Sequence, residues 1–151
     1  MSTPTAVSPA TPGGATGPDP TVVDALARAC AEFGADEVER LALFQAAIVA
    51  SNLRTDGDDE ERLGVLGQNR FWGPAVARRD PQTAALVFLK QARRLCAAGA
   101  PRSAARLASQ VQGGPGVARH ALARRTAERM IAGIDDVSAG AGVVVPRPVE
   151  A

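Results

Sequence analysis

Three helix-start signals constrain this chain more than any other feature of its sequence. Asp-Pro pairs at 19–20 and 80–81 place a capping carboxylate before a proline, and proline is favoured at the first position of a helix. Asp36 is followed three residues later by Glu39, the spacing of a capping box, in which each side chain binds the other residue's backbone N–H. These signals predict helices that begin near residues 20, 37 and 81.

Apolar residues recur at helical spacing after each of these starts. The first helix has one apolar face before Gly34, a residue suited to a left-handed helix end: Val22, Leu26, Cys30 and Phe33. The second helix is apolar around much of its circumference from 38 to 48, and the third is apolar through its middle, from 84 to 95. Helices with so little polar surface belong in a core.

Two further helices are predicted after residue 100. A short one spans about 101–111, and glycines at 113, 114 and 116 then break the chain. A last helix spans 117–132, with an expected apolar face of four residues: Val117, Ala121, Met130 and Ile131. The sequence therefore predicts an all-α fold, a compact domain of five to six helices.

The chain length fits one domain with a tail at each end. Its 151 residues are 46% hydrophobic but only 3% aromatic, so the core must consist mostly of Ala, Leu and Val. Residues 1–18 are rich in Pro, Gly, Thr and Ala, a composition typical of disordered segments. Residues 134–151 are expected to form a flexible tail, in which 143–145 could dock as a short strand. The predicted helical domain is 19–133.

Charge and hydropathy argue against two classes of partner. The net charge is +1, so no overall field attracts nucleic acid or an anionic membrane. The sequence has no apolar run long enough for a membrane-spanning helix. Its first twenty residues lack the basic and apolar regions of a secretory signal peptide. We therefore expect neither nucleic acid nor membrane as a partner. The expected location is the cytoplasm, or a virion if a phage encodes the chain.

The chain is poor in residues that hold metals or cofactors. His120 is its only histidine, which argues against a zinc site and against a Ser-His-Asp arrangement. Cys30 and Cys96 fall on different predicted helices, where free thiols are favoured over a disulfide in a reducing compartment. The acidic loop 55–62 lacks the spacing of a calcium-binding EF-hand and is expected to be solvated. We expect no metal and no cofactor.

The segment 47–81 holds most of the unusual residue types. A helix end, Ala50-Ser51-Asn52-Leu53-Arg54-Thr55, leads into the acidic loop. Gly64-Val65-Leu66-Gly67-Gln68, Trp72-Gly73 and Asp80-Pro81 follow. In order and spacing, this segment resembles the lysozyme-like domain of the lytic transglycosylase and goose-type lysozyme superfamily, in the version found in high-GC Gram-positive bacteria and their phages. Val111-Gln112 and Pro115 resemble the piece that closes the cleft in that family.

The resemblance implies a helical fold around a central helix, with a cleft for a peptidoglycan strand. It places the family's catalytic Glu at Ala50, where a carboxylate would be partly desolvated, and a sugar-facing Gln at Gly67. Arg119 falls near the place of a family Tyr. The resemblance also implies five candidate residues for contact with a glycan: Ser51, Gln68, Asn69, Trp72 and Gln112. Phe71 and Trp72 could stack on a sugar ring, or at least one of them could fill the core.

The residue at position 50 decides the predicted function. Cleavage of a glycosidic bond needs a proton donor, normally a carboxylic acid whose pKa is raised by apolar surroundings. The methyl group of Ala50 cannot donate a proton. The sequence therefore predicts a catalytically degenerate domain that binds peptidoglycan or acts as a structural or interaction module.

Two alternatives remain open. One is an active peptidoglycan-cleaving enzyme that uses a displaced acid such as Asp58, Asp59 or Glu61. The other is an unrelated helical protein that binds a partner through its tails or through its arginine-bearing last helix.

Overall fold

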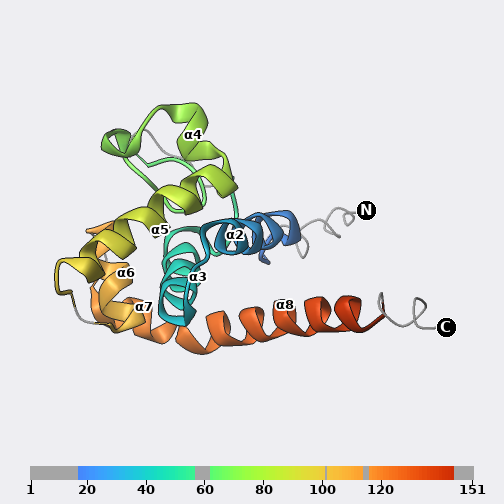
Figure 1. The fold of residues 1–151 in the computed structure, drawn as a ribbon. Helices are drawn as coiled ribbons and strands as arrows, with labels where there is room; N and C mark the ends of the chain where they lie inside the picture. Colours follow the sequence, from blue (N-terminus) through green and yellow to red (C-terminus); the bar gives the residue numbers. More distant parts are fainter. Residues whose placement is uncertain (1–16, 57–61, 101, 114–115, 145–151) are drawn as a thin grey trace, which may run out of the picture.

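The computed structural model describes residues 17–56, 62–100, 102–113 and 116–144, with the backbone alone for 138–144 (Figure 1). Seven α-helices lie in these ranges and confirm an all-α fold. The helices are α2 (Pro20–Phe33), α3 (Glu37–Ser51), α4 (Ala75–Arg79), α5 (Pro81–Ala97), α6 (Ala104–Gln112), α7 (Val117–Leu122) and α8 (Arg124–Val144). A 3-10 helix, η2, spans Arg70–Trp72. Residues 1–16 and 145–151, where the sequence predicts tails, lie outside the described ranges.

The predicted helix starts are confirmed. Asp19 accepts a hydrogen bond from Thr21 N at 2.9 Å, and Asp80 accepts one from Thr83 N at 2.9 Å. Both bonds of the capping box are present, because Asp36 accepts from Glu39 N while Glu39 accepts from Asp36 N. Gly34 ends α2 at φ 73°, in the left-handed region. Each cap satisfies backbone N–H groups that the first turn of a helix leaves without a partner.

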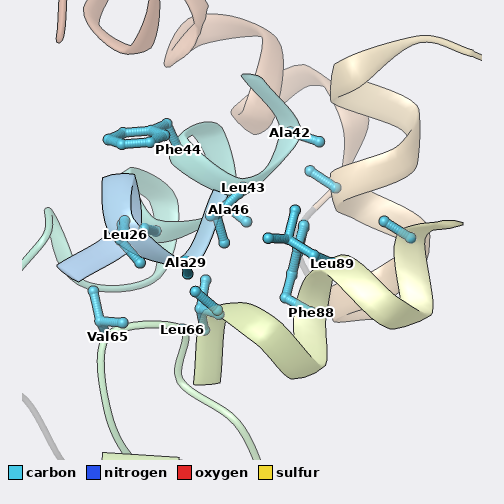
Figure 2. Close-up of a cluster of buried hydrophobic side chains, with 14 of the residues drawn as sticks. Leu26, Ala29, Ala42, Leu43, Phe44, Ala46, Val65, Leu66, Phe88 and Leu89 are labelled. Atoms are coloured by element: carbon cyan, nitrogen blue, oxygen red, sulfur yellow. The ribbon is translucent and has the colours of Figure 1, made fainter. Parts of the chain in front are cut away.

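The α3 helix is the centre of the domain and contacts α2, α5, α6, α7 and α8. Its middle turns are buried, as the sequence predicts for a helix with little polar surface. Leucines, alanines and phenylalanines from α2, α3 and α5 pack together there. Val65 and Leu66, from the segment between α3 and α5, complete this cluster (Figure 2). A core built mostly of small aliphatic side chains is what the low aromatic content requires.

A buried carboxylate joins α3 to α5. Glu39 accepts hydrogen bonds from Arg93 Nη2 at 2.7 Å and Arg93 Nε at 2.9 Å. The same guanidinium lies over the ring of Phe33, 4.2 Å from its centroid. The capping box of α3 is therefore linked to the tertiary structure, because Glu39, which completes the cap, also accepts hydrogen bonds from an arginine of α5.

In the described part of the segment between α3 and α5, residues 52–56 and 62–80, the helical pieces are η2 and the short α4. An isolated β-bridge pairs Leu63 with Gln68 across a tight turn. Arg78, a buried residue of α4, holds this turn through hydrogen bonds from Nη1 to Gln68 O at 3.1 Å and from Nε to Gly73 O at 2.9 Å. The five-residue α4 has no predicted counterpart because it is shorter than a recognisable apolar repeat.

The C-terminal part differs from the prediction. The predicted helix 117–132 is two helices, α7 and α8, which are separated at Ala123. The second continues to Val144, so residues 134–144 are helical where the sequence predicts a flexible tail, and 143–144 are not a strand. A single-sequence pattern misses this extension because the glycines at 133, 140 and 142 lower helix propensity.

The predicted apolar face of that last helix is only half right. Met130 and Ile131 pack against the core, but Val117 and Ala121 are exposed. The break at Ala123 rotates α7 so that His120 is its buried residue. Three residues of this region are buried instead: His120, Ala123 and Ala127.

In the part of the chain that the structure describes, no helix has both the length and the apolar character to cross a membrane.

Candidate functional site

The two positions at which the resemblance places functional side chains lie next to each other. A Cβ added to Gly67 would be 3.6 Å from the Cβ of Ala50. One comes from the end of α3 and the other from the turn that the Leu63–Gln68 bridge closes. Ala50 is exposed, so a carboxylate there would be solvated and not partly desolvated as the resemblance implies. Gly67 has φ +56°, a conformation that a glutamine adopts only with strain.

Ser51 is turned inward toward the protein backbone. Its Oγ donates a hydrogen bond to Val65 O at 2.7 Å and lies 3.2 Å from Ala47 O. The same oxygen accepts from Arg54 N at 3.3 Å. The hydroxyl therefore fastens the end of α3 to the following turn, and its hydrogen-bonding capacity is used within the protein.

Gln68 and Asn69 also serve the local structure. Gln68 is buried, and its Nε2 donates to Ala84 O of α5 at 3.3 Å. The side chain of Asn69 accepts from Phe71 N at 3.0 Å and so caps η2. Burial keeps Gln68 from recognising a glycan, and the side-chain oxygen of half-buried Asn69 is used in the cap.

Gln112, at the end of α6, is the centre of a polar cluster that the sequence did not predict. Its Nε2 lies 3.3 Å from Ala46 O and 3.2 Å from Leu66 O, while its Oε1 lies 2.8 Å from Nε2 of His120. The Nδ1 atom of His120 faces Gly116 O at 3.2 Å. Gln45 completes the cluster with a 2.7 Å hydrogen bond from Nε2 to His120 O.

The imidazole of His120 is fully buried. Burial lowers its pKa below the usual 6.5, although the contact with Gly116 O opposes that shift. A neutral ring donates through one nitrogen, and both ring nitrogens face oxygen acceptors, Gln112 Oε1 and Gly116 O. The cluster therefore links α3, α6 and α7, and its role is structural.

Four of the five candidate residues, Gln68, Asn69, Trp72 and Gln112, line a cavity of only about 10 Å³. That volume is about what one water molecule needs. Trp72 and Phe88 form apolar parts of its lining beside Gly67, and no Asp or Glu of the described chain lines it. The resemblance implies a cleft for a sugar chain, and at this point the structure has a depression too small to enclose a sugar ring.

The two adjacent aromatic residues differ in exposure. Trp72 is half-buried and packs against the core cluster. Phe71 is 85% exposed, with the Arg70 guanidinium 5.6 Å from its ring centroid. At least one aromatic residue is thus a packing residue, as predicted.

The acidic loop contributes one described carboxylate, Asp56. It is exposed and forms an ion pair with Arg54. The hydrogen bond from Arg54 lowers the pKa of Asp56, which is the opposite of what a general acid requires. Asp58, Asp59 and Glu61, the candidate displaced acids, lie outside the described residues. Within the part of the chain that the structure describes, no group of three or more His, Cys, Asp or Glu residues could hold a metal ion.

A much larger hollow, of about 800 Å³, lies between α2 and α8; we call it the α2–α8 groove. Residues of α2 such as Val23 and Ala27 form one side, and Met130, Ile134 and Val137 of α8 form the other. Buried Cys30 and Phe44 also line it. This groove is not predicted from the sequence, because part of one side belongs to residues 134–137, which are expected to lie in a flexible tail.

Cys30 and Cys96 are free thiols, and burial raises the pKa of Cys30 to about 11.

Comparison with known proteins identifies no relative: no protein-family model, curated protein or solved structure matches the chain.

Proposed function

We propose that this chain is a catalytically degenerate lysozyme-like domain that acts without turnover, as a structural or interaction module. The observation that carries the proposal is the contact between positions 50 and 67. The resemblance assigns a proton donor and a sugar-facing amide to these positions, and they are adjacent in space. They hold a methyl group and a hydrogen atom, neither of which can donate a proton or bind a hydroxyl group.

The surroundings of these two positions support the absence of turnover. General acid catalysis requires a carboxylic acid that stays protonated, and apolar surroundings normally achieve this. Ala50 is exposed, and the nearest described carboxylate of the acidic loop, Asp56, has a lowered pKa. Loss of a general acid costs about 10²–10⁴ in rate.

The hydrogen-bond partners of the candidate side chains favour an interaction module over a glycan-binding one. Ser51, Gln68 and Gln112 all bond to backbone carbonyls of the domain itself. Sugar recognition needs polar groups that converge on the ligand. The 10 Å³ cavity beside them leaves no room for a sugar ring.

A second candidate function is weak binding of peptidoglycan, favoured by one observation. Phe71 exposes 85% of its surface next to the small cavity's Trp72. An exposed aromatic ring can stack on the apolar face of a sugar without a pocket. This function would need no catalytic group.

Two measurements on the purified full chain test the proposal. The first is release of dye from labelled peptidoglycan sacculi, with an active lysozyme as the positive control; we expect no release. Turnover by the unmodified chain would overturn the proposal. In that case, Asp58→Asn, Asp59→Asn and Glu61→Gln would identify a displaced acid, since the variant that lacks it should be inactive.

The second measurement is co-sedimentation of the chain with insoluble sacculi. We expect no retention above that of an inert protein of similar charge. If the chain is retained, if Phe71→Ala removes the retention and if Leu122→Ala does not, the glycan-binding function would be favoured over the interaction module. Leu122 is a suitable control because it is 84% exposed.

A further inference from the structure

The α8 helix carries a strict apolar stripe along its whole length. Starting at Ala123, the residue just before the helix, apolar residues recur at alternating spacings of four and three: Ala123, Ala127, Met130, Ile134, Val137, Ala141 and Val144. This spacing is the heptad pattern of helices that pack side by side. An isolated surface helix does not need it, so the stripe indicates a helical neighbour over the full length of α8.

The domain itself covers only the first half of that stripe. Ala123 and Ala127 are buried, Met130 and Ile134 are half-buried, and Val137 is 74% exposed. The packing partners of α8 are α3 and α7, and its C-terminal half extends past them (Figure 1). The apolar face thus leaves the core and continues beside the α2–α8 groove.

The groove is apolar and its charges are compensated. Asp24 and Arg28 form an ion pair with each other on α2. Arg40 and Asp135 form a second pair with two hydrogen bonds, of 2.9 and 3.2 Å. The four charges at the groove therefore cancel, and an occupant of the groove should be apolar and uncharged.

We propose that a second copy of this chain fills the groove with the C-terminal half of its own α8. Residues 138–144 read SAGAGVV, so that half-helix is uncharged and small. It also continues the heptad stripe, so it offers an apolar face to the apolar groove of the other copy. Its lack of charged side chains matches the cancelled charges of the groove.

The arrangement closes on itself as a two-fold pair. If two α8 helices lie antiparallel with the axis near Val137, residue 144 of one copy lies beside residue 130 of the other. Each half-helix, of seven or eight residues, is about 10–12 Å long, which matches the stretch from Met130 to Val137 that it would cover. Gly133 on this wall has open space where a Cβ would be, which permits close approach of a second helix. Each copy gives and receives the same segment, as a two-fold interface requires.

Light scattering coupled to size-exclusion chromatography, over a range of concentrations, tests this pair with full-length variants. We expect the unmodified chain to be a dimer. Val137→Asp should raise the dimer Kd by ~100-fold or more, because each copy would place an unpaired carboxylate in an apolar contact. The matched control is Val76→Asp, since Val76 is 77% exposed and lies on α4, away from the groove. It should remain a dimer.

Two further variants keep the test independent of any one substitution. A chain that ends at residue 137 should be a monomer, because it lacks the segment that fills the groove. Val137→Cys should form a disulfide-linked dimer on oxidation, whereas Val76→Cys should not. Both variants keep Cys30 and Cys96, so any disulfide that these native thiols form would also appear in the Val76→Cys control.

A monomeric unmodified chain would overturn the proposal, as would a Val137→Asp variant that remains dimeric. If only a chain without residues 1–16 dimerises, the occupant of the groove is the chain's own N-terminal segment and the proposal fails. Loss of the dimer in Val76→Asp would move the interface away from the groove. These results do not depend on whether the chain binds glycan.

Discussion

Gly64 lies directly against the backbone of Arg78: a Cβ added to Gly64 would be 1.9 Å from Arg78 O. This contact holds the turn after the acidic loop against α4. Arg78 in turn donates hydrogen bonds to the carbonyls of Gln68 and Gly73. The turn that carries Gly67 is therefore positioned by a backbone contact that only glycine permits.

We expect Gly64→Ala to destabilise the domain by more than about 3 kcal/mol, since the clash with backbone adds to the strain of a positive φ. Gly34→Ala is the matched control. Gly34 has φ +73°, close to the +80° of Gly64, but nothing within 4 Å of its added Cβ. That variant should lose only about 1–2 kcal/mol. Urea unfolding of both variants measures the difference, and equal losses would contradict the contact.

His120 predicts a pH dependence of stability. Its folded-state pKa is lowered by burial, so the unfolded chain binds a proton more readily than the native one. The free energy of unfolding should therefore fall as the pH drops below about 6.5, the ordinary value, toward the lowered folded-state pKa. Thermal melts between pH 7.5 and about 5.5 measure this above the range of ordinary carboxylates.

The control for that pH dependence is His120→Gln, which cannot titrate. It should be less stable at pH 7, because it disturbs the contact with Gln112, but its stability should change less between the same two pH values. A native chain that becomes more stable on acidification would show that the ring is charged in the fold, donating to both Gln112 and Gly116.

The two thiols should differ in reactivity. Burial raises the pKa of Cys30 to about 11, so at pH 8 only about one molecule in a thousand carries the reactive thiolate there. Cys96 is half-buried at the end of α5 and is more accessible. We expect iodoacetamide to modify Cys96 first, as read by peptide mass spectrometry. Urea should abolish the difference, and equal rates in the native chain would contradict the buried position of Cys30.

Ala50→Glu should not restore turnover. The position is exposed, so the new carboxyl group would keep a pKa near 4 and be ionised at neutral pH. Adding Gly67→Gln should cost stability, since Gly67 has φ +56°. The dye-release assay measures turnover by both variants, and urea unfolding measures the loss of stability. Activity in Ala50→Glu alone would mean that a bound glycan desolvates the site.

The sequence alone determined where three helices begin. The caps at Asp19, Asp36 and Asp80 depend on residues two or three positions away, so local chemistry fixes them. The sequence also determined that α3 lies at the centre of the domain, because a helix with so little polar surface must be buried by other helices.

Only the tertiary structure decided which polar groups the core would use. Ser51, Gln68 and Gln112 are candidate ligand contacts in the sequence, and their partners in the fold are carbonyls 14 to 66 residues away. The same holds for buried His120 and for the outer half of α8, whose neighbour the single chain does not supply. Spacing along a helix specifies a face, but what that face meets depends on distant residues, and a sequence rich in alanine distinguishes its faces weakly.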